Sequence, residues 1–257
     1  MSIAELAQSL LDAADGPHHH PRPLLEGNPL SVSHGRDIQH AQLALRQHRG
    51  ESLVGVKLGL TTRAQRDDAG VDYSSVGYLT DEMVVTERIE RSRSVAPKVE
   101  PEMVAVFDST VENPEVTDAE IVAAIGSLRA GIEIVDPRYE SPHFVLPDAL
   151  ADNSSARGAA WSPTGLRPDQ FDPAAETVVL EAGGHPALEG HASIILGNPL
   201  RVVIEVVRER LQRGVPTPAG FVIFTGNLAG QALPVEPGEK VVATFALLGR
   251  IELDVVD

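Results

Sequence analysis

The stretch APKVEPEMVAVFD, residues 96–108, opens an apolar run with two carboxylates that flank a proline. Alternate residues of a strand point to the same face, so Glu100 and Glu102 are expected to project together. Pro101 cannot donate a hydrogen bond to a neighbouring strand, which favours the start or the edge of a sheet for this pair. Two close carboxylates repel each other and burial strengthens the repulsion. A strand that enters a core in this way therefore needs a nearby positive charge.

A third acid, Glu133, stands alone among apolar residues in AGIEIVDPRYES, residues 130–141. An unpaired charge is costly in such surroundings. Mg²⁺ and Mn²⁺ prefer oxygen ligands, and Glu133 together with Glu100 and Glu102 would supply one face of an octahedral site. The alternative is that Glu100 and Glu102 only solvate an exposed strand end. The residues by themselves leave both interpretations open.

The composition indicates one large soluble domain and excludes several partners. The chain has 257 residues, of which 42% are hydrophobic, and a formal net charge of −16. This charge argues against binding to nucleic acid or to anionic membrane surfaces. The chain has no cysteine, so disulfides and thiolate ligands are excluded and a cytoplasmic location is expected. Residues 1–16 are typical of an amphipathic helix and not of a signal peptide, and no apolar run approaches a membrane span.

The hydrophobic pattern predicts an α+β fold. Residues 1–52 form a helical N-terminal part, with helices expected over 2–14 and 33–50, and residues 53–257 form a larger strand-rich part. Within the larger part, strands are expected over 53–60, 102–107, 131–136, 177–184, 191–197, 221–226 and 239–256. Two further helices are expected over 116–131 and 198–214.

Other polar residues are candidates for binding a substrate. Lys57 lies between glycines in an apolar strand, where it either meets a negative substrate group or extends its amine to water. The polar segment from Asp152 to Ser155 is a candidate helix cap or a cradle for a substrate carboxylate. Arg138 could pair with a carboxylate, and Tyr139 could donate a hydrogen bond.

A series of segments, taken in order, resembles one group of lyases in the fumarylacetoacetate hydrolase superfamily. These lyases are the 4-oxalocrotonate decarboxylases and the 2-hydroxypenta-2,4-dienoate (2-keto-4-pentenoate) hydratases. The resemblance covers the chain from about residue 53 to its end. The segments are VGVKLGLT (54–61), GVDYSSVGYLTDEM (70–83), PKVEPEMVAVF (97–107), GIEIVDPRYES (131–141), ALADNSSARG (149–158), GNPL (197–200), PAGFVIFTG (218–226) and PVEPGEKVVATFALLGRIEL (234–253).

The resemblance implies a mixed, rolled β-sheet around a metal centre, which would make residues 53–257 a metal-dependent catalytic domain. It implies Mg²⁺ or Mn²⁺ held by Glu100, Glu102 and Glu133. The catalytic positions that it marks are Lys57, Glu82, Ser155 and Arg138. The substrate-binding positions that it marks are Leu60, Asp152, Tyr139 and Thr225. It also implies a homo-oligomer and an association with the cognate hydratase or decarboxylase.

The resemblance further implies the reaction. The expected activity is decarboxylation of 4-oxalocrotonate (2-oxohex-3-enedioate) to 2-hydroxypenta-2,4-dienoate through a metal-bound dienolate, in the meta-cleavage degradation of aromatic compounds. The segments VDPRYESPHF (135–144) and VPTPAGFVIFTG (215–226) are closer to the decarboxylase pattern, whereas GYLTDEM (77–83) is closer to the hydratases. We therefore expect a decarboxylase, with a 2-hydroxypenta-2,4-dienoate hydratase as the alternative.

Two further alternatives are a carbon–carbon hydrolase of the same superfamily and an inactive partner subunit. A hydrolase would need a His–Glu pair to activate water, and no histidine lies near Lys57 or Glu100 in the sequence. The retained carboxylates and Lys57 argue against loss of chemistry. The chain departs from the usual pattern at Glu82, where Asp is more common, and in the loop 225–235, which is one residue longer and is expected to border the site.

Overall fold

A large mixed sheet forms the centre of the molecule. In a computed structural model of the chain, residues 1–141 and 145–257 are described. The sheet has the spatial order β4 (Ser75–Thr80), β3 (Leu53–Gly59), β11 (Val222–Asn227), β6 (Lys98–Phe107), β7 (Ile125–Val135) and β8 (Ala156–Trp161), with β12 (Leu233–Pro234) paired to β6. Strands β11 and β3 are parallel and the other neighbours are antiparallel.

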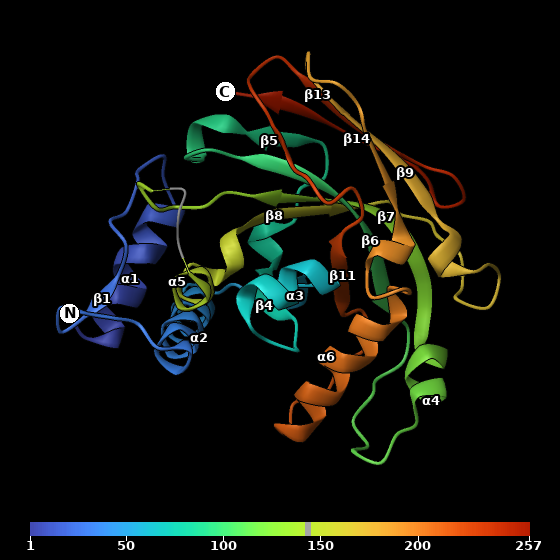
Figure 1. Cartoon of the computed structure of the whole chain (residues 1–257), viewed down its shortest axis with the longest axis horizontal. Coiled ribbons are helices and arrows are strands. Elements are labelled where there is room, and N and C mark those ends of the chain that lie inside the picture. Colours follow the sequence, from blue (N-terminus) through green and yellow to red (C-terminus); the bar gives the residue numbers. More distant parts are fainter. Residues whose placement is uncertain (142–144) are drawn as a thin grey trace.

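The sheet is rolled until its two ends nearly meet (Figure 1). The chain leaves β4 through a short turn, Asp81–Met83, and Val84 then forms a bridge to Ala159 of β8. The backbone N–H of Val85 donates to the carbonyl of Ala159 at 2.9 Å. The segment that follows the first strand of the large sheet is therefore joined to the last strand by backbone contacts, and the rolled sheet has an inner and an outer face.

The two faces of the rolled sheet have different cores. The inner face carries a small apolar cluster of Leu79, Met83, Val104, Ala156, Ala159, Val222 and Phe224. Alternate residues of the same strands, such as Met103, Ile132 and Ile223, belong to the main core on the outer face. By this alternation Lys57 and the three glutamates lie on the inner face, beside the small cluster.

A second sheet and two helices cover the outer face. The second sheet has the order β10 (Leu188–His191), β9 (Thr177–Ala182), β13 (Lys240–Phe245), β14 (Gly249–Val256) and β5 (Arg88–Glu90). The covering helices are α4 (Asp118–Ala123) and α6 (Leu200–Gln212), and a short helix α3 (Arg63–Ala69) follows β3. Residues of both sheets and of α6 share the main core.

The N-terminal helices are α1 (Ile3–Ala14) and α2 (Val32–His48), joined through the two-residue strands β1 (Leu24–Leu25) and β2 (Asn28–Pro29). Ser2 and Glu5 form a capping box at the start of α1, which satisfies backbone N–H groups that have no partner within the helix. The two helices pack on α5 (Leu146–Ala151) and on Tyr139. The predicted helical part therefore rests on a segment of the strand-rich part, and the division at residue 52 stays a prediction.

The α+β class and the rolled mixed sheet are confirmed, whereas several local predictions are wrong. The helix predicted over 116–131 ends at Ala123, and β7 begins at Ile125 because the following residues alternate between the two faces and pair along β6. The strand predicted over 191–197 ends at His191. Its remainder forms a turn in which Leu196 and Gly197 have positive φ.

Pro101 also differs from expectation, since it lies inside a central strand and not at a strand start or sheet edge. It pairs with Ile132 of β7 on one side. On the other side it falls between the residues that pair with β11 and those that pair with β12, so its missing N–H interrupts no ladder there. No helix in the described ranges is long and apolar enough to cross a membrane.

Candidate metal centre

Three glutamates from β6 and β7 meet on the inner face of the rolled sheet. Glu100 and Glu133 are direct partners across the two strands, and Glu102 lies two residues further along β6. One oxygen of each carboxylate lies within 4.8 Å of the others. Glu102 and Glu133 are fully buried, and Glu100 is partly buried. The fold thus concentrates negative charge where water cannot screen it.

The close approach of the three carboxylates and their burial raise the pKa values of two of them. Burial, reinforced by Glu133, raises the pKa of Glu100 to about 7. Burial and then the same neighbour raise the pKa of Glu102 well above its ordinary value. Glu102 Oε1 and Glu133 Oε2 have no hydrogen-bond partner among the described residues. Buried acceptor oxygens without donors need a proton or a cation, and an all-oxygen donor set fits a hard divalent ion.

Lys57 from β3 lies at the edge of the carboxylate group. Its Nζ is 2.9 Å from Glu133 Oε1, and the side chain is buried. Burial lowers the pKa of Lys57, but the charges of Glu133, Glu100 and Glu102 outweigh it and leave the pKa above its ordinary value. The lysine is therefore held as an ammonium, and its amine does not extend to water.

Gly77 of β4 makes room for this lysine. It pairs with Lys57 across β3 and β4. A Cβ added at Gly77 would lie 2.9 Å from Lys57 Cδ and 2.7 Å from the carbonyl oxygen of Asn153. The absence of a side chain at this position is thus a condition for the observed path of the lysine.

We predict that Gly77→Ala destabilises the protein by about 1–3 kcal/mol, because the backbone oxygen of Asn153 cannot yield as a flexible side chain would. The displaced Lys57 should also lower turnover. Urea unfolding measures the first effect and steady-state kinetics the second. Gly184→Ala is the matched control, since no described atom lies within 4 Å of an added Cβ there. Equal unfolding free energies for the two variants would contradict the packing argument.

The end of β11 and the loop that follows it border the centre, as expected from the sequence. The backbone N–H of Gly226 donates to Glu102 Oε2 at 2.7 Å. Gly226 has a φ of +103°, and an added Cβ would collide with Thr61. The side chain of Asn227 lowers the pKa of Glu100, donates to the carbonyl of Gln231 at 2.9 Å and accepts from the N–H groups of two residues in the loop. Gly226 therefore fixes the orientation of Glu102, and Asn227 fixes the shape of the loop.

The expected substrate-binding residues Leu60 and Thr225 flank this loop. Leu60 follows the last residue of β3 with a φ of +55°, and its carbonyl accepts from Arg66 Nε. Thr225 is fully buried, and its hydroxyl donates to the carbonyl of Met103 at 3.0 Å. Thr225 precedes Gly226, which donates to Glu102, and Leu60 lies three residues after Lys57, which pairs with Glu133. Among the described residues, the side chains of Leu60 and Thr225 make no hydrogen bond to the three carboxylates.

Residues 153–155 form a strained turn that follows α5. Asn153, Ser154 and Ser155 have φ values of 51°, 52° and 59°, in the left-handed region that favours glycine. Asn153 Oδ1 accepts from the N–H of Tyr78 at 2.8 Å and from Gln39 Nε2 at 3.1 Å. The interpretation of this segment as a helix cap agrees with its first residue, since Asp152 is the C-terminal cap residue of α5 and its backbone N–H donates to the carbonyl of Asp148. Backbone strain of this kind persists only where surrounding contacts enforce it, and it is typical of functional sites.

Arg138 and Asp152 form a buried pair beneath this turn. Arg138 Nε is 2.6 Å from Asp152 Oδ1, and both side chains are almost fully buried. The remaining guanidinium nitrogens donate to the carbonyls of Asp136, Ala156 and Asp152. Burial raises the pKa of Asp152 to about 6, against the opposing effect of Arg138.

The other expected site residues attach to this pair or lie apart. Ser155 Oγ donates to Asp152 Oδ2 at 3.2 Å. The Tyr139 hydroxyl donates to the carbonyl of Asp148 at 2.6 Å. Glu82 is exposed in the turn after β4, next to the seam where the sheet closes. The structure therefore brings together Lys57 and the three glutamates, whereas Arg138, Asp152 and Ser155 form a separate group and Tyr139 packs with the N-terminal helices.

Gly77, Gly226, Asn227 and Gln39 were not expected as site residues. Each acts through a neighbour that is distant in sequence, so its role does not follow from the local pattern alone. Gly226 and Gly77 lie inside otherwise apolar strands, and a glycine in such a place is a sign of close backbone approach.

The fold and the geometry agree with comparisons to known proteins. No family model matches the sequence. The chain is 33% identical over 256 residues to a 4-oxalocrotonate decarboxylase from Pseudomonas sp., a match that covers 98% of this chain and 97% of the relative. It is 30% identical over 238 residues to a 2-keto-4-pentenoate hydratase from Paraburkholderia xenovorans (strain LB400), covering 91% and 88%.

A solved structure supports the same relationship. The 4-oxalocrotonate decarboxylase from Pseudomonas putida G7, complexed with magnesium and adipate, superposes with a TM-score of 0.90 at 26% identity. The match covers 99% of this chain and 97% of that structure. The chain therefore belongs to the family of 4-oxalocrotonate decarboxylases and 2-keto-4-pentenoate hydratases.

Proposed function

We propose that the protein is a metal-dependent lyase that decarboxylates 4-oxalocrotonate to 2-hydroxypenta-2,4-dienoate. The observation that carries this proposal is the buried group of Glu100, Glu102 and Glu133, with unpartnered oxygens beside the ammonium of Lys57. The solved decarboxylase binds magnesium and adipate, a six-carbon dicarboxylate of the same length as 4-oxalocrotonate. This ligand supports a dicarboxylate substrate for the present chain.

The three glutamates would hold Mg²⁺, with Mn²⁺ as the alternative ion. A divalent ion bound there would act as a Lewis acid on the C2 oxygen of a 2-oxo acid. Gly226 fixes one oxygen of Glu102 and leaves Oε1 for the ion. Lys57 holds a second positive charge 2.9 Å from Glu133, where its protons can reach an oxygen of the bound substrate.

The inner face of the sheet favours loss of CO₂ over addition of water. The side chains beside the carboxylates on this face include Leu79, Val104 and Phe224, which are buried and apolar. Such surroundings solvate an ionised carboxylate poorly, whereas CO₂ is neutral. For a substrate whose distal carboxylate lies along this face, decarboxylation would therefore remove the unfavourable contact between that charged group and the apolar side chains.

Hydration of 2-hydroxypenta-2,4-dienoate is the second candidate function. It is supported by the hydratase relative at 30% identity and by the acidic pair Asp81–Glu82, which lies at the seam of the rolled sheet. The described members of the carboxylate group include no histidine, which argues against a hydrolase that needs a His–Glu pair.

The decisive experiment incubates the purified protein with Mg²⁺ or Mn²⁺ and either 2-oxohex-3-enedioate or freshly generated 2-hydroxypenta-2,4-dienoate. Release of CO₂ from the first substrate is the expected result. Loss of the dienol ultraviolet absorbance without CO₂ would instead identify a hydratase. No turnover of either substrate with either ion would contradict both functions and favour an inactive partner subunit.

We predict that affinity for Mg²⁺ rises with pH as the pH increases through about 7. The pKa of Glu100 is raised to about 7 in the metal-free protein, so at lower pH a proton competes with the ion for this carboxylate. Below pH 7 the dissociation constant should increase by about tenfold per pH unit for each proton displaced. Calorimetric titration between about pH 5.5 and 8.5 measures it, and a flat profile would contradict the assignment.

The raised pKa of Glu100 also makes the stability of the metal-free protein depend on pH in a defined way. Because the folded pKa of Glu100 exceeds that of the unfolded chain, the folded state binds more protons between about 4.5 and about 7. This contribution to stability is fully present below about pH 4.5 and is lost as the pH rises through about 7. We expect Mg²⁺ to restore the loss, so that the ion stabilises the protein more at pH 8 than at pH 5.

The assembly of the protein is also a proposal. We expect a cytoplasmic homo-oligomer that associates with its cognate hydratase, because the product of the decarboxylase is the substrate of the hydratase. Light scattering of the purified chain, alone and mixed with that hydratase, measures both states.

A further inference from the structure

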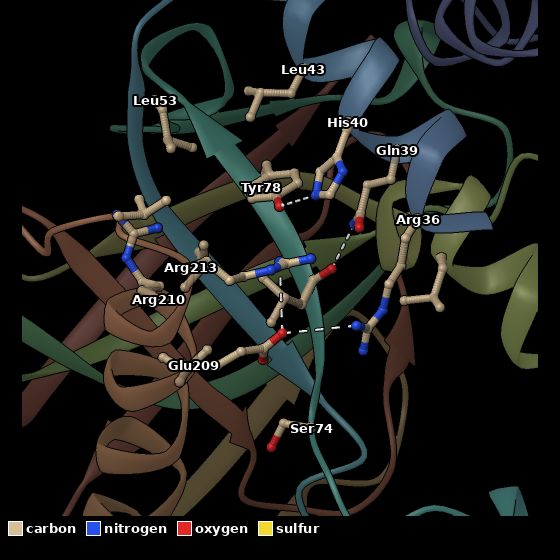
Figure 2. Close-up of a pocket in the computed structure, with 15 residues that line it drawn as sticks. Arg36, Gln39, His40, Leu43, Leu53, Ser74, Tyr78, Glu209, Arg210 and Arg213 are labelled. Carbon is tan, nitrogen blue, oxygen red and sulfur yellow. Dashed lines mark hydrogen bonds and ion pairs between the residues drawn. The ribbon is translucent and has the colours of Figure 1, made fainter. Parts of the chain in front are cut away.

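A second cavity lies on the outer face of the rolled sheet, between α2, the strands β3 and β4, and α6 (Figure 2). Its volume is about 380 Å³, which is large enough for a small organic ligand. Val56 and Tyr78 form part of its wall, and they alternate along their strands with Lys57 and Gly77. The cavity is therefore on the opposite side of the sheet from the carboxylate group.

The cavity has a local excess of positive charge in an acidic protein. Its described lining includes Arg36, Arg210 and Arg213 but a single carboxylate, Glu209, whereas the whole chain has a net charge of −16. Arg210 is engaged, since it stacks on Phe221 and donates to the carbonyl of Pro216 at 2.6 Å. The other two arginines determine what the cavity can bind.

Arg36 and Arg213 both retain unused hydrogen-bond donors. Their nearest guanidinium nitrogens are 3.9 and 3.7 Å from Glu209 Oε1, too far for hydrogen bonds (Figure 2). Neither guanidinium donates a hydrogen bond to any residue that the structure describes. Two guanidinium groups beside one half-buried carboxylate have capacity for a second anion.

The pKa of His40 is affected by the positive charges around this cavity. Its Nε2 is 3.0 Å from the hydroxyl of Tyr78 on the cavity wall. Burial lowers the pKa of His40, and the charges of Arg213 and Arg36 lower it further, although Asp37 opposes them. The imidazole is therefore neutral at pH 7 and adds a polar edge without competing for an anion.

The remaining wall is apolar. Leu43 of α2, Leu53 and Val56 of β3, and Val206 of α6 line it. An inorganic anion would gain nothing from this wall, whereas an aromatic ring would bury its faces against it. The cavity thus combines a guanidinium pair for a carboxylate with an apolar surface for a ring.

We propose that this cavity is a binding site for a small aromatic monocarboxylate, with the carboxylate between Arg36 and Arg213 and the ring against Leu43, Val56 and Val206. Bidentate pairing with planar guanidinium groups fixes the charged end. The site is independent of the metal centre and does not rest on the proposed function.

Benzoate is the probe, and calorimetric titration at pH 8 is the measurement. It is made on the Glu102→Gln variant as well as on the wild type, because benzoate could also bind a metal ion at the carboxylate group. Arg36→Gln and Arg213→Gln should each weaken binding by about tenfold or more, since each loses a charge-assisted hydrogen bond. Arg201→Gln, the same charge change at an exposed position of α6, should leave binding unchanged.

Glu209→Gln gives a test in the opposite direction. It removes the carboxylate that competes for both arginines, so benzoate should bind several-fold more tightly. Benzyl alcohol, which has the ring without the charge, should not bind measurably. The proposal is overturned if benzoate does not bind the wild type, if its binding is lost with Glu102→Gln, or if Arg36→Gln and Arg213→Gln leave it unchanged. Circular dichroism of each variant verifies folding.

Discussion

Glu102→Gln is expected to lower the affinity for Mg²⁺ by at least about 100-fold and to reduce decarboxylation by a similar or larger factor. Substitution of residues that only support metal ligands already costs 10–100-fold, and Glu102 is itself a proposed ligand. The amide keeps the shape of the side chain and can still accept the N–H of Gly226 through its oxygen. The variant therefore removes the negative charge with little change in packing.

The same variant separates metal binding from folding. In the metal-free protein, Glu102 is fully buried with a pKa raised by burial and by Glu133. Replacing it with a neutral amide removes an unfavourable ionisation, so at pH 8 the metal-free variant should be at least as stable as the wild type. Thermal unfolding with and without Mg²⁺ measures this difference.

The exposed Glu181 provides the control, since Glu181→Gln makes the same change on the surface of β9. Mg²⁺ should stabilise this control as it stabilises the wild type, and it should leave Glu102→Gln unaffected. A metal site elsewhere would be indicated if Mg²⁺ raised the unfolding temperature of Glu102→Gln as much as that of the control.

The sequence predicts the local part of the site and the class of fold, but not the contacts between distant segments. The i, i+2 spacing of Glu100 and Glu102 fixes a common face for them, and the family resemblance adds Glu133. Their convergence needs the register of β6 against β7, in which Glu100 is opposite Glu133. No property of either segment alone determines that register, because apolar residues on both sides of both strands are buried.

The failed helix over 116–131 has a related cause. Its sequence VTDAEIVAAIGSLRAG contains a capping box at Thr117 and good helix formers, so a helix begins there as predicted. The segment after Ala124 is equally compatible with a strand, and the backbone partners offered by β6 decide the outcome. In the segment VDPRYESPHF, residues 142–144 lie outside the described residues.

The roles expected for Arg138 and Asp152 lead to the second large prediction. The resemblance marks Arg138 as catalytic, whereas its guanidinium group is buried and directed at protein oxygens. We propose that the pair positions Ser155, whose hydroxyl donates to Asp152. Arg138→Met is then expected to destabilise the protein by about 3–5 kcal/mol at pH 8, because it leaves a buried carboxylate without its partner.

The loss of stability caused by Arg138→Met should be larger at high pH than at low pH. The pKa of Asp152 is about 6 in the presence of Arg138 and rises further once that charge is removed. Below about pH 6 the carboxyl is neutral in the variant, so the loss of stability should be smaller there than at pH 8. Urea unfolding at the two pH values measures the difference. Adding Asp152→Asn to Arg138→Met should recover part of the stability at pH 8, which a double-mutant cycle quantifies.

Arg208→Met is the matched control, because Arg208 pairs with the exposed Asp118 and such surface pairs contribute about 0–1 kcal/mol.

Measuring both stability and turnover of Arg138→Met also separates a positioning role of Arg138 from a catalytic one. A positioning pair loses stability and turnover together, and the double variant recovers part of both. If Arg138→Met instead keeps wild-type stability while kcat falls by about 100-fold or more, Arg138 contacts the substrate in the working enzyme. The guanidinium would then have to leave Asp152 when the substrate binds, and the buried pair would be the resting arrangement of a catalytic residue.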